Sequence, residues 1–211
     1  MKKYLLVEGI TDVAFVKYVC FKNGITKQFD DFKKSKKEYT FNDLVIINMD
    51  GQSNLDAELS LLKAQDTKID KIAIIEDADD DFKTSQENIE KSINKSKINS
   101  SKIKYFLTPN NKDLGNLETL LLSTVQDKNI VKCFADYKAC LLDGHEIYPK
   151  ALDKGQVYSY TMYSQSGKDL HKPQNSFMYE YSNTYKDTKL WDLTKPEFQP
   201  IIKFILEIFK K

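Results

Sequence analysis

The fold is decided by one short stretch, Lys71-Ile72-Ala73-Ile74-Ile75-Glu76-Asp77-Ala78-Asp79, in which an apolar run leads directly into acidic residues. An apolar run without alternation is typical of a strand that is covered on both faces. The segment Leu44-Val45-Ile46-Ile47 has the same character. The stretch therefore predicts a buried parallel strand whose C-terminal end carries carboxylates.

On either side of this strand, apolar runs alternate with amphipathic segments through the first half of the chain. We expect strands at 3–7, 44–48, 71–75 and 103–107, and helices at 11–22, 54–64 and 85–97. This βαβαβαβ order predicts an α/β fold of Rossmann-like type, with a mostly parallel central sheet flanked by helices.

The chain divides by composition into a core and an extension. Residues 1–125 hold the strand and helix pattern, and the lysine-rich and aspartate-rich segment at 26–42 is expected to be a solvated insertion. Residues 126–211 predict further helices, one of them at 197–210, and a tyrosine-rich segment. We expect an α+β extension packed on the same core, because no linker separates it. Cys133 and Cys140, on one predicted helix, are expected to be core residues.

The composition excludes several function classes. The 211 residues include 32 basic and 31 acidic side chains, so the net charge of +1 gives no general attraction for nucleic acid or an anionic membrane. Every basic residue is a lysine, so this chain supplies no arginine finger. It contains neither a GxxxxGK[ST] motif nor a GxGxxG motif, which argues against an ATPase site or a dinucleotide site of its own.

The cysteine and hydropathy patterns indicate where the protein works. Three cysteines without a CxxC pair indicate a reducing compartment rather than a disulfide framework. No apolar run approaches the roughly 20 residues that span a bilayer. We therefore expect a soluble cytoplasmic protein without a membrane partner.

Acidic side chains follow three of the predicted strands. Glu8 and Asp12 come after the first strand, Asp77 and Asp79 after the third, and Glu118 beyond the fourth. Because the carboxyl ends of parallel strands share one edge of a sheet, we expect these acids to converge. Gathered carboxylates repel one another unless a cation lies among them, and oxygen ligands without His or Cys favour Mg²⁺ or Mn²⁺. The sequence predicts a divalent-metal site.

Each acid also has an ordinary structural interpretation, which stays open at this point. Glu8 and Glu118 can face the positive N-termini of helices, and Asp12 can cap the helix that follows it. The acids from Asp77 to Asp81 can form a hydrated turn. Taken singly, these interpretations are favoured. The combination of Glu-Gly after the first strand and Asp-x-Asp after the third favours metal binding.

Three motifs resemble those of the Toprim domain, the catalytic module of topoisomerases, bacterial primases, recombination proteins and the overcoming-lysogenisation-defect (OLD) nucleases. They are Leu6-Val7-Glu8-Gly9 with Asp12, Asp50-Gly51-Gln52-Ser53-Asn54, and Ile74-Ile75-Glu76-Asp77-Ala78-Asp79. Small stand-alone Toprim proteins have later signatures that resemble Phe106-Leu107-x-Pro109-Asn110-Asn111, Gly115-x-Leu117-Glu118-x-Leu120-Leu121 and, more loosely, Asp153-Lys154-x-x-Val157-Tyr158-x-Tyr160 and residues 191–205. The resemblance covers nearly the whole chain and is strong to about Leu122.

The resemblance implies roles for the acidic residues. Glu8 is similar to the Toprim glutamate, which is a metal ligand or a general acid/base. Asp77 and Asp79 are similar to the metal-binding Asp-x-Asp pair. Asp12 and Glu118 stand where OLD-type nucleases place further metal ligands. All five residues are therefore candidate ligands of Mg²⁺.

Two further positions and a function follow from the same resemblance. Lys154 is similar to a lysine that offsets charge on the scissile phosphate, and Gly51 to a glycine that lets the backbone approach substrate. The winged-helix tyrosine of type II topoisomerases and the zinc module of primases are missing. The resemblance thus implies a Mg²⁺-dependent nuclease of DNA or RNA, in defence or DNA repair. OLD nucleases join their Toprim domain to an ATPase, so a separate partner protein is expected to supply that activity here. Two alternatives stay open: a non-catalytic module that binds nucleic acid or a partner ATPase as a regulator, and phosphoryl transfer on a small molecule.

Overall fold

A computed structural model describes residues 1–125, 127–143, 149–164 and 192–209. Its centre is a six-stranded sheet in the order β2-β3-β4-β1-β5-β6. The strands are β1 (Lys2–Val7), β2 (Lys33–Ser35), β3 (Glu38–Phe41), β4 (Leu44–Asn48), β5 (Ile69–Asp77) and β6 (Ile103–Thr108). Strands β4, β1, β5 and β6 run parallel, whereas β3 runs antiparallel to both of its neighbours, β2 and β4. The predicted α/β class, with a mostly parallel Rossmann-like sheet, is confirmed.

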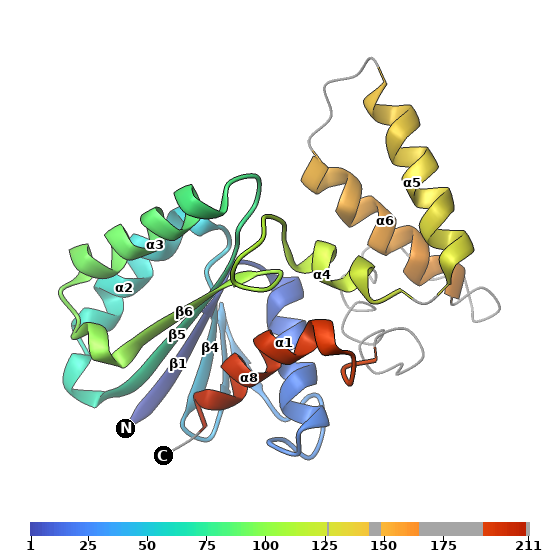
Figure 1. The fold of residues 1–211 in the computed structure, drawn as a ribbon. Helices are drawn as coiled ribbons and strands as arrows, with labels where there is room; N and C mark the ends of the chain where they lie inside the picture. The colour runs from blue at the N-terminus through green and yellow to red at the C-terminus, as the bar shows by residue number, and fades with distance from the viewer. Residues whose placement is uncertain (126, 144–148, 165–191, 210–211) are drawn as a thin grey trace.

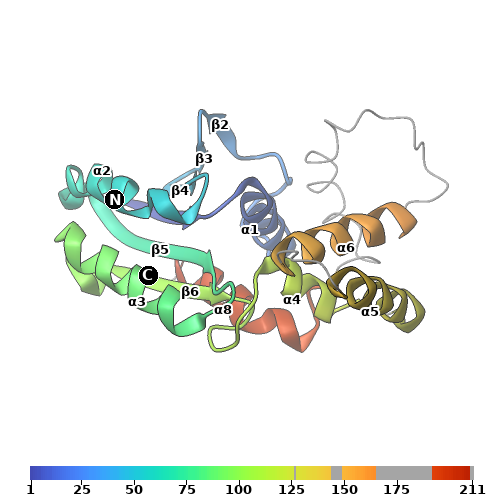
Figure 2. The same ribbon diagram turned by 90° about the horizontal axis from the view of Figure 1, so that it is seen from above.

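Helices cover both faces of the sheet. They are α1 (Ile10–Lys22), α2 (Leu55–Lys63), α3 (Phe82–Ser96), α4 (Leu117–Ser123), α5 (Lys128–Leu142), α6 (Pro149–Ser164) and α8 (Gln199–Glu207), with short 3-10 helices η1 (Gln52–Asn54), η2 (Asp66–Lys68), η3 (Ser100–Lys102) and η5 (Pro196–Phe198). Figures 1 and 2 show α1 and α8 on one face of the sheet and α2 and α3 on the other. Within the described ranges, no helix has the length and apolar character needed to cross a membrane.

Strand side chains alternate between two hydrophobic cores. In β1, Leu5 and Val7 pack with α1 and α8, whereas Tyr4 and Leu6 pack with α2 and α3. Strands β4 and β5 alternate in the same way. Each fully buried aliphatic side chain contributes roughly 1.5–3 kcal/mol, so a shift of register by one residue would be very costly. The alternation therefore fixes the face from which each residue at a strand end leaves the sheet.

The segment at 26–42 is more ordered than the sequence predicted. It contains the β2–β3 hairpin, which extends the sheet by two antiparallel strands, and it buries Phe29, Phe32 and Tyr39. Lys37, in the turn between the two strands, contacts Glu58 of α2. The prediction of a solvated insertion was wrong. Most lysines of this segment lie on an exposed outer strand and its turn, and they dominate the composition although aromatic side chains between them are buried.

The C-terminal region joins the same core as α1. Val157 and Tyr160 of α6 are buried in it, and so are Phe198 and Ile205 from η5 and α8. In the described residues from 127 onward, all regular elements are helical. Most of the tyrosine-rich segment, residues 165–191, lies outside the described residues, and the expected β structure of the extension with it.

Helix α5 departs from the expected burial. Figure 1 shows α5 and α6 standing away from the sheet beyond α4. Cys133 and Cys140 of α5 are exposed, so the prediction that they are core residues was wrong. The reason is that α5 packs through one side only, with Ile130 and Phe134 partly buried.

Candidate acidic site

The predicted acids lie where the helix connections diverge. Strands β1 and β5 are neighbours, with Val7 paired to Ile75, at the centre of the sheet in Figure 1. Strand β1 leads to α1 on one face, and β5 leads to α3 on the other. In open α/β sheets, the crevice at such a switch point is the usual place for a ligand. Glu8 and the segment from Asp77 to Asp79 both leave the sheet at this point.

The loop after β4 is tied to the same edge. The N–H of Met49 donates to the carbonyl of Val7 at 2.9 Å, and the N–H of Gly51 donates to the carbonyl of Glu8 at 2.9 Å. Gly51 has φ of 115°, in the region that glycine favours. A Cβ there would meet only the Ser53 hydroxyl at 3.9 Å, so backbone conformation is the local reason for this glycine.

Asp12 is the centre of one group of acids. Its side chain is 9% exposed, and its Oδ2 accepts a hydrogen bond of 2.9 Å from the N–H of Gly9. Burial, with the negative charges of Asp77, Glu118 and Glu8, raises the pKa of Asp12 well above its usual range. The structure therefore brings together acids from the ends of β1 and β5 and from α4.

Asp12 is not the residue that caps α1. The helix begins at Ile10 after Gly9, and Asp12 reaches back to the Gly9 N–H from the third helical position. Asp12 thus does take part in the N-terminal capping of α1, as the capping interpretation proposed, but from the third helical position and not as the N-cap residue. The same contact directs one oxygen of Asp12 toward the chain segment that follows Glu8.

Asp77 connects the sheet to α4. Its Oδ1 accepts hydrogen bonds from the Thr108 hydroxyl at 2.7 Å and from the N–H of Leu117 at 3.2 Å. Leu117 is the first residue of α4, and Glu118, which is 3% exposed, is the next. The carboxylate of Asp77 therefore fixes the start of the helix that carries Glu118.

Asp79 connects two loops. It adopts φ of 50° and exchanges two backbone hydrogen bonds of 2.8 Å with Gly115. Its Oδ2 accepts from the side-chain amide of Gln52 at 3.1 Å, and the same amide donates to the carbonyl of Asp77 at 3.1 Å. The loops after β4 and β5 and the loop before α4 are joined here. Farther along the chain, Asp81 caps α3 through the N–H groups of Lys83 and Thr84, a role that the interpretation as a hydrated turn did not include.

Glu76 was not assigned a role from the sequence. It leaves β5 on the face of α2 and α3, opposite to Asp77, because neighbouring strand residues alternate. It is 5% exposed, and burial together with the charges of Glu8, Asp77 and Asp79 raises its pKa to about 8. The charge of Glu8 thus acts on Asp12 on one side and on Glu76 on the other. The signal that was available is its position, directly before the Asp-x-Asp motif.

The donor set fits a hard divalent cation in chemistry, although its side chains are not gathered into a closed ligand group. All the charged groups that raise the pKa values of Asp12 and Glu76 are carboxylates, whose repulsion a cation would relieve. Among the described residues, no group of three or more His, Cys, Asp or Glu side chains is arranged so that it could hold a metal ion. Ligation by these acids therefore requires side-chain rotation.

A family model covers almost the entire chain. The model described as "Protein of unknown function (DUF3226)" matches residues 2–210. The chain belongs to this family. No curated protein matches it. The DUF3226 chain is similar to one solved structure, the hypothetical protein PH0156 from Pyrococcus horikoshii OT3, with a TM-score of 0.54 and 14% identity over 98% of this chain and 100% of that one. At this identity the likeness shows the fold alone.

Lys154 is the predicted site residue that the described contacts do not bring to the acids. It is half-buried on α6, and no hydrogen bond or ion pair joins it to the acids in the described parts of the chain. Its neighbour Asp153 accepts a hydrogen bond of 3.1 Å from the Thr119 hydroxyl of α4 and pairs with Lys138 at 2.9 Å. Helix α6 is therefore bound to α4 at Thr119, next to Glu118, and the residue of α6 that makes this contact is Asp153, not Lys154.

Proposed function

We propose that this chain is a Mg²⁺-dependent phosphodiester hydrolase of DNA or RNA, as the Toprim-like motifs imply. The observation that carries the proposal is the convergence at Asp12, where burial and the charges of Asp77, Glu118 and Glu8 act on one carboxyl group. Titratable groups whose pKa values are shifted by burial and by neighbouring charges cluster at functional sites, so such acids in a crevice are candidates for catalysis.

In this proposal, Glu8, Asp77 and Asp79 are the principal ligands of the metal, and Asp12 and Glu118 complete the site. Mn²⁺ would serve as a substitute, because it also prefers oxygen ligands. When bound, the ion supplies positive charge to the phosphate as negative charge develops on it. Glu8 also remains a candidate general acid/base, and Lys154 a candidate charge partner.

The protein's own hydrogen bonds orient the two aspartates of the Asp-x-Asp motif. Asp77 Oδ1 accepts hydrogen bonds from Thr108 and Leu117, which fix the orientation of this carboxylate between β6 and α4. Asp79 Oδ2 accepts from Gln52, which orients that carboxylate toward the loop after β4. The two aspartates are thus positioned by groups from separate elements, as ligands in a rigid site are.

Cleavage assays test this proposal directly. Supercoiled, linear and single-stranded substrates are incubated with Mg²⁺ or Mn²⁺, and Asp77→Asn/Asp79→Asn is expected to reduce cleavage by a factor of about 100 or more. Asp80→Asn is the matched control, because it removes one charge from the same loop at an exposed position. Cleavage that survives the double substitution would exclude these acids as its source.

A non-catalytic module is the second candidate, in which the same edge binds nucleic acid or a partner ATPase as a regulator. It is favoured by the structural role of Asp77, whose Oδ1 holds the start of α4. Calorimetric unfolding separates the two: stabilisation by Mg²⁺ that Asp77→Asn/Asp79→Asn abolishes supports the hydrolase, and indifference to Mg²⁺ with retained nucleic-acid binding supports the module. In either case we place the protein in the cytoplasm, with phage defence or DNA repair as its setting.

A further inference from the structure

A cleft of about 400 Å³ opens between α2 and α3, beside the acidic site. Ser53 and Asp56 line one wall of the cleft, and Asn88 and Ser92 line the other. Glu76, from the sheet, also lines the cleft. Cavities of roughly 300–1,000 Å³ are typical of small-molecule sites. The cleft is therefore large enough for a ligand, and hydroxyl, amide and charged groups line it together with Leu55 and Ile89.

The cleft is connected to the acidic site by Gln52. This residue lines the cleft, and its side-chain amide donates to Asp79 Oδ2 and to the carbonyl of Asp77. A ligand in the cleft would therefore lie next to the proposed metal ligands, on the α2 and α3 face of the sheet.

Glu76 supplies the observation that points to a ligand. Its side chain is 5% exposed, and its Oε1 has no hydrogen-bond partner within the described residues. Buried polar atoms are nearly always hydrogen-bonded, and exceptions call for an explanation such as a ligand. A ligand group that donates a hydrogen bond to Oε1 would satisfy this atom.

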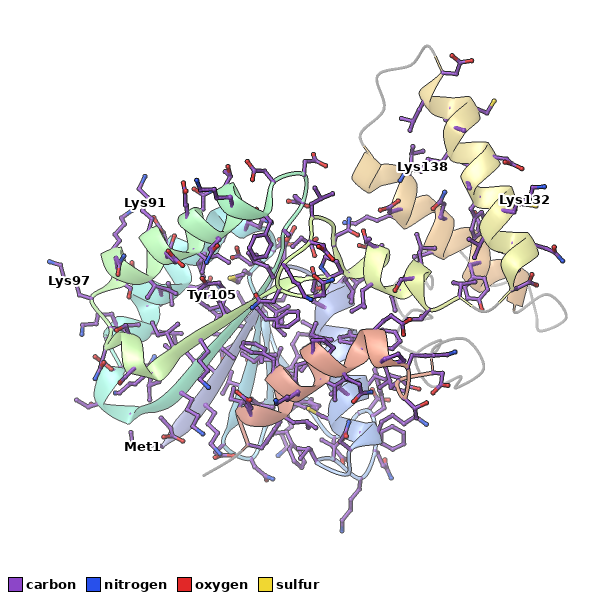
Figure 3. The ribbon with its side chains drawn as sticks, viewed as in Figure 1. Met1, Lys91, Lys97, Tyr105, Lys132 and Lys138 are labelled. Atoms are coloured by element: carbon purple, nitrogen blue, oxygen red, sulfur yellow. The ribbon has the colours of Figure 1, made fainter. Side chains whose placement is uncertain are left out.

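The charges around the cleft are distributed unevenly. Lys95 pairs with Asp56 across the two helices at 2.5 Å, so these two charges offset each other. Lys91 also lines the cleft, and no ion pair is described for it. Figure 3 shows Lys91 projecting outward from α3, with Lys97 at the C-terminal end of that helix. The cleft thus has a positive charge at its mouth and a hydrogen-bond acceptor at its base.

We propose that this cleft binds a single nucleotide, with an amino group of its base donating to Glu76 and its phosphate contacting Lys91. Lysine suits phosphate as a point charge, and the hydroxyl and amide groups of Ser92 and Asn88 suit a sugar. The inference rests on the proposed hydrolase function, which makes nucleic acid the source of the nucleotide. It deepens that function, because it identifies where one nucleotide of the substrate binds. The nucleotide is either an unpaired residue of a strand or a free nucleoside monophosphate.

Calorimetric titration with cytidine and uridine monophosphates (CMP and UMP) tests the base contact. CMP carries an amino group where UMP carries a carbonyl oxygen, so the wild-type protein is expected to bind CMP more tightly than UMP. The change Glu76→Met is expected to raise the Kd for CMP about tenfold or more and to remove the preference. Neither ligand contains a phosphodiester bond, so binding remains measurable with Mg²⁺ or with EDTA even if the chain cleaves nothing. If CMP and UMP do not bind, the cleavage assays still test the hydrolase function independently.

A pair of lysine variants tests the phosphate contact. Lys91→Gln is expected to raise the Kd values for CMP and UMP by a similar factor, about threefold or more, because it removes the charge without touching the base. Lys97→Gln removes an equal charge at the C-terminal cap of α3, outside the cleft, and is expected to leave both values unchanged. If Glu76→Met does not fold, this pair decides: unequal effects support the proposal and equal effects overturn it.

Two further ligands complete the experiment. Inorganic phosphate that binds as tightly as CMP, or a Kd for CMP that Glu76→Met leaves unchanged, would overturn the proposal. A single-stranded oligocytidine that binds more tightly than CMP, with the gain lost in Glu76→Met, identifies a strand as the source of the nucleotide. Equal affinity for the two ligands, lost in the same variant, identifies the free nucleotide.

Discussion

Glu76 shows how a single buried carboxyl group links the site to the stability of the protein. Its pKa is raised to about 8 by burial and by the charges of Glu8, Asp77 and Asp79. The folded protein therefore binds a proton that the unfolded chain has lost between about pH 4.5 and about pH 8. Stability from this group consequently falls as pH rises through that interval. Asp12 has the same sign, because its pKa is raised as well.

This sign gives a prediction for the metal-free protein. In EDTA, the free energy of unfolding is expected to fall by on the order of 2 kcal/mol between about pH 5 and about pH 8. Glu76→Gln is expected to make the profile less steep, because it removes one of the two groups whose pKa values are raised. The carboxyl groups with lowered pKa values, Asp56, Asp66, Asp81 and Asp192, titrate at lower pH and do not contribute there. Urea unfolding at a series of pH values measures this, and a wild-type stability that rises over the interval would contradict it.

At the scale of elements, the position of α4 depends on the bridge between Asp79 and Gly115. Gly115 has φ of 129°, and a Cβ added to it would lie 2.9 Å from the Thr119 hydroxyl. Contacts this short do not occur without movement, so any other residue would push α4 away from the loop after β5. The bridge thus joins the Asp-x-Asp motif to the helix that carries Glu118.

Gly115→Ala is therefore expected to destabilise the protein by roughly 1–3 kcal/mol and to weaken binding of Mg²⁺. Gly24→Ala is the matched control, because Gly24 also has positive φ, 71°, but its added Cβ would meet nothing within 4 Å. The control isolates the cost of backbone strain, and the difference between the two variants isolates the collision with Thr119. Urea unfolding and Mg²⁺ titration of both variants measure these effects; equal losses would show that the collision is unimportant.

The elements also show how far the sequence reaches. The bounds of β4 were predicted exactly as found, because its apolar run has clear ends. Strand β5 continues two residues beyond the predicted end, through Asp77. Glu76 and Asp77 are consequently strand residues on opposite faces, whereas a loop would have left their directions open. The sequence thus predicted that the acids share an edge but not that they divide between two faces.

Pairings between distant segments were beyond reach for a different reason. The bridge from Asp79 to Gly115 joins two loops that lie far apart in the sequence, and no local pattern encodes it. The hairpin of β2 and β3 is a local contact, but its lysine-rich sequence gave no strand signal. Propensity even opposed the hairpin, because lysine is a weak strand former. Lys154 remains a prediction from resemblance, because the local pattern that suggested it does not fix the direction of its side chain.

At the scale of the whole molecule, the C-terminal elements complete the core beneath α1. Phe198 is fully buried, and its ring lies 5.9 Å from that of Phe15 between centroids. Helix α1 carries Asp12, so the packing of η5 and α8 against α1 supports the position of one of the proposed ligands.

Phe198→Ala is accordingly expected to lower the free energy of unfolding by roughly 3–5 kcal/mol through the cavity that it leaves. Val131→Ala, on the partly exposed surface of α5, is the control and is expected to change stability by about 0.5 kcal/mol or less. Denaturant unfolding followed by circular dichroism measures both. Similar small effects would mean that the C-terminal elements are not part of the cooperative core.

The outer strand β2 also bears on how copies of this chain meet. It pairs with β3 alone, and Lys33 and Lys34 on it are exposed. A second copy that tried to extend the sheet would have to align its own ammonium groups with these. Such an arrangement is repulsive, and edge lysines are a common natural defence against aggregation. The segment that obscured the hairpin in the sequence is thus the part of the sheet that discourages open-ended polymerisation.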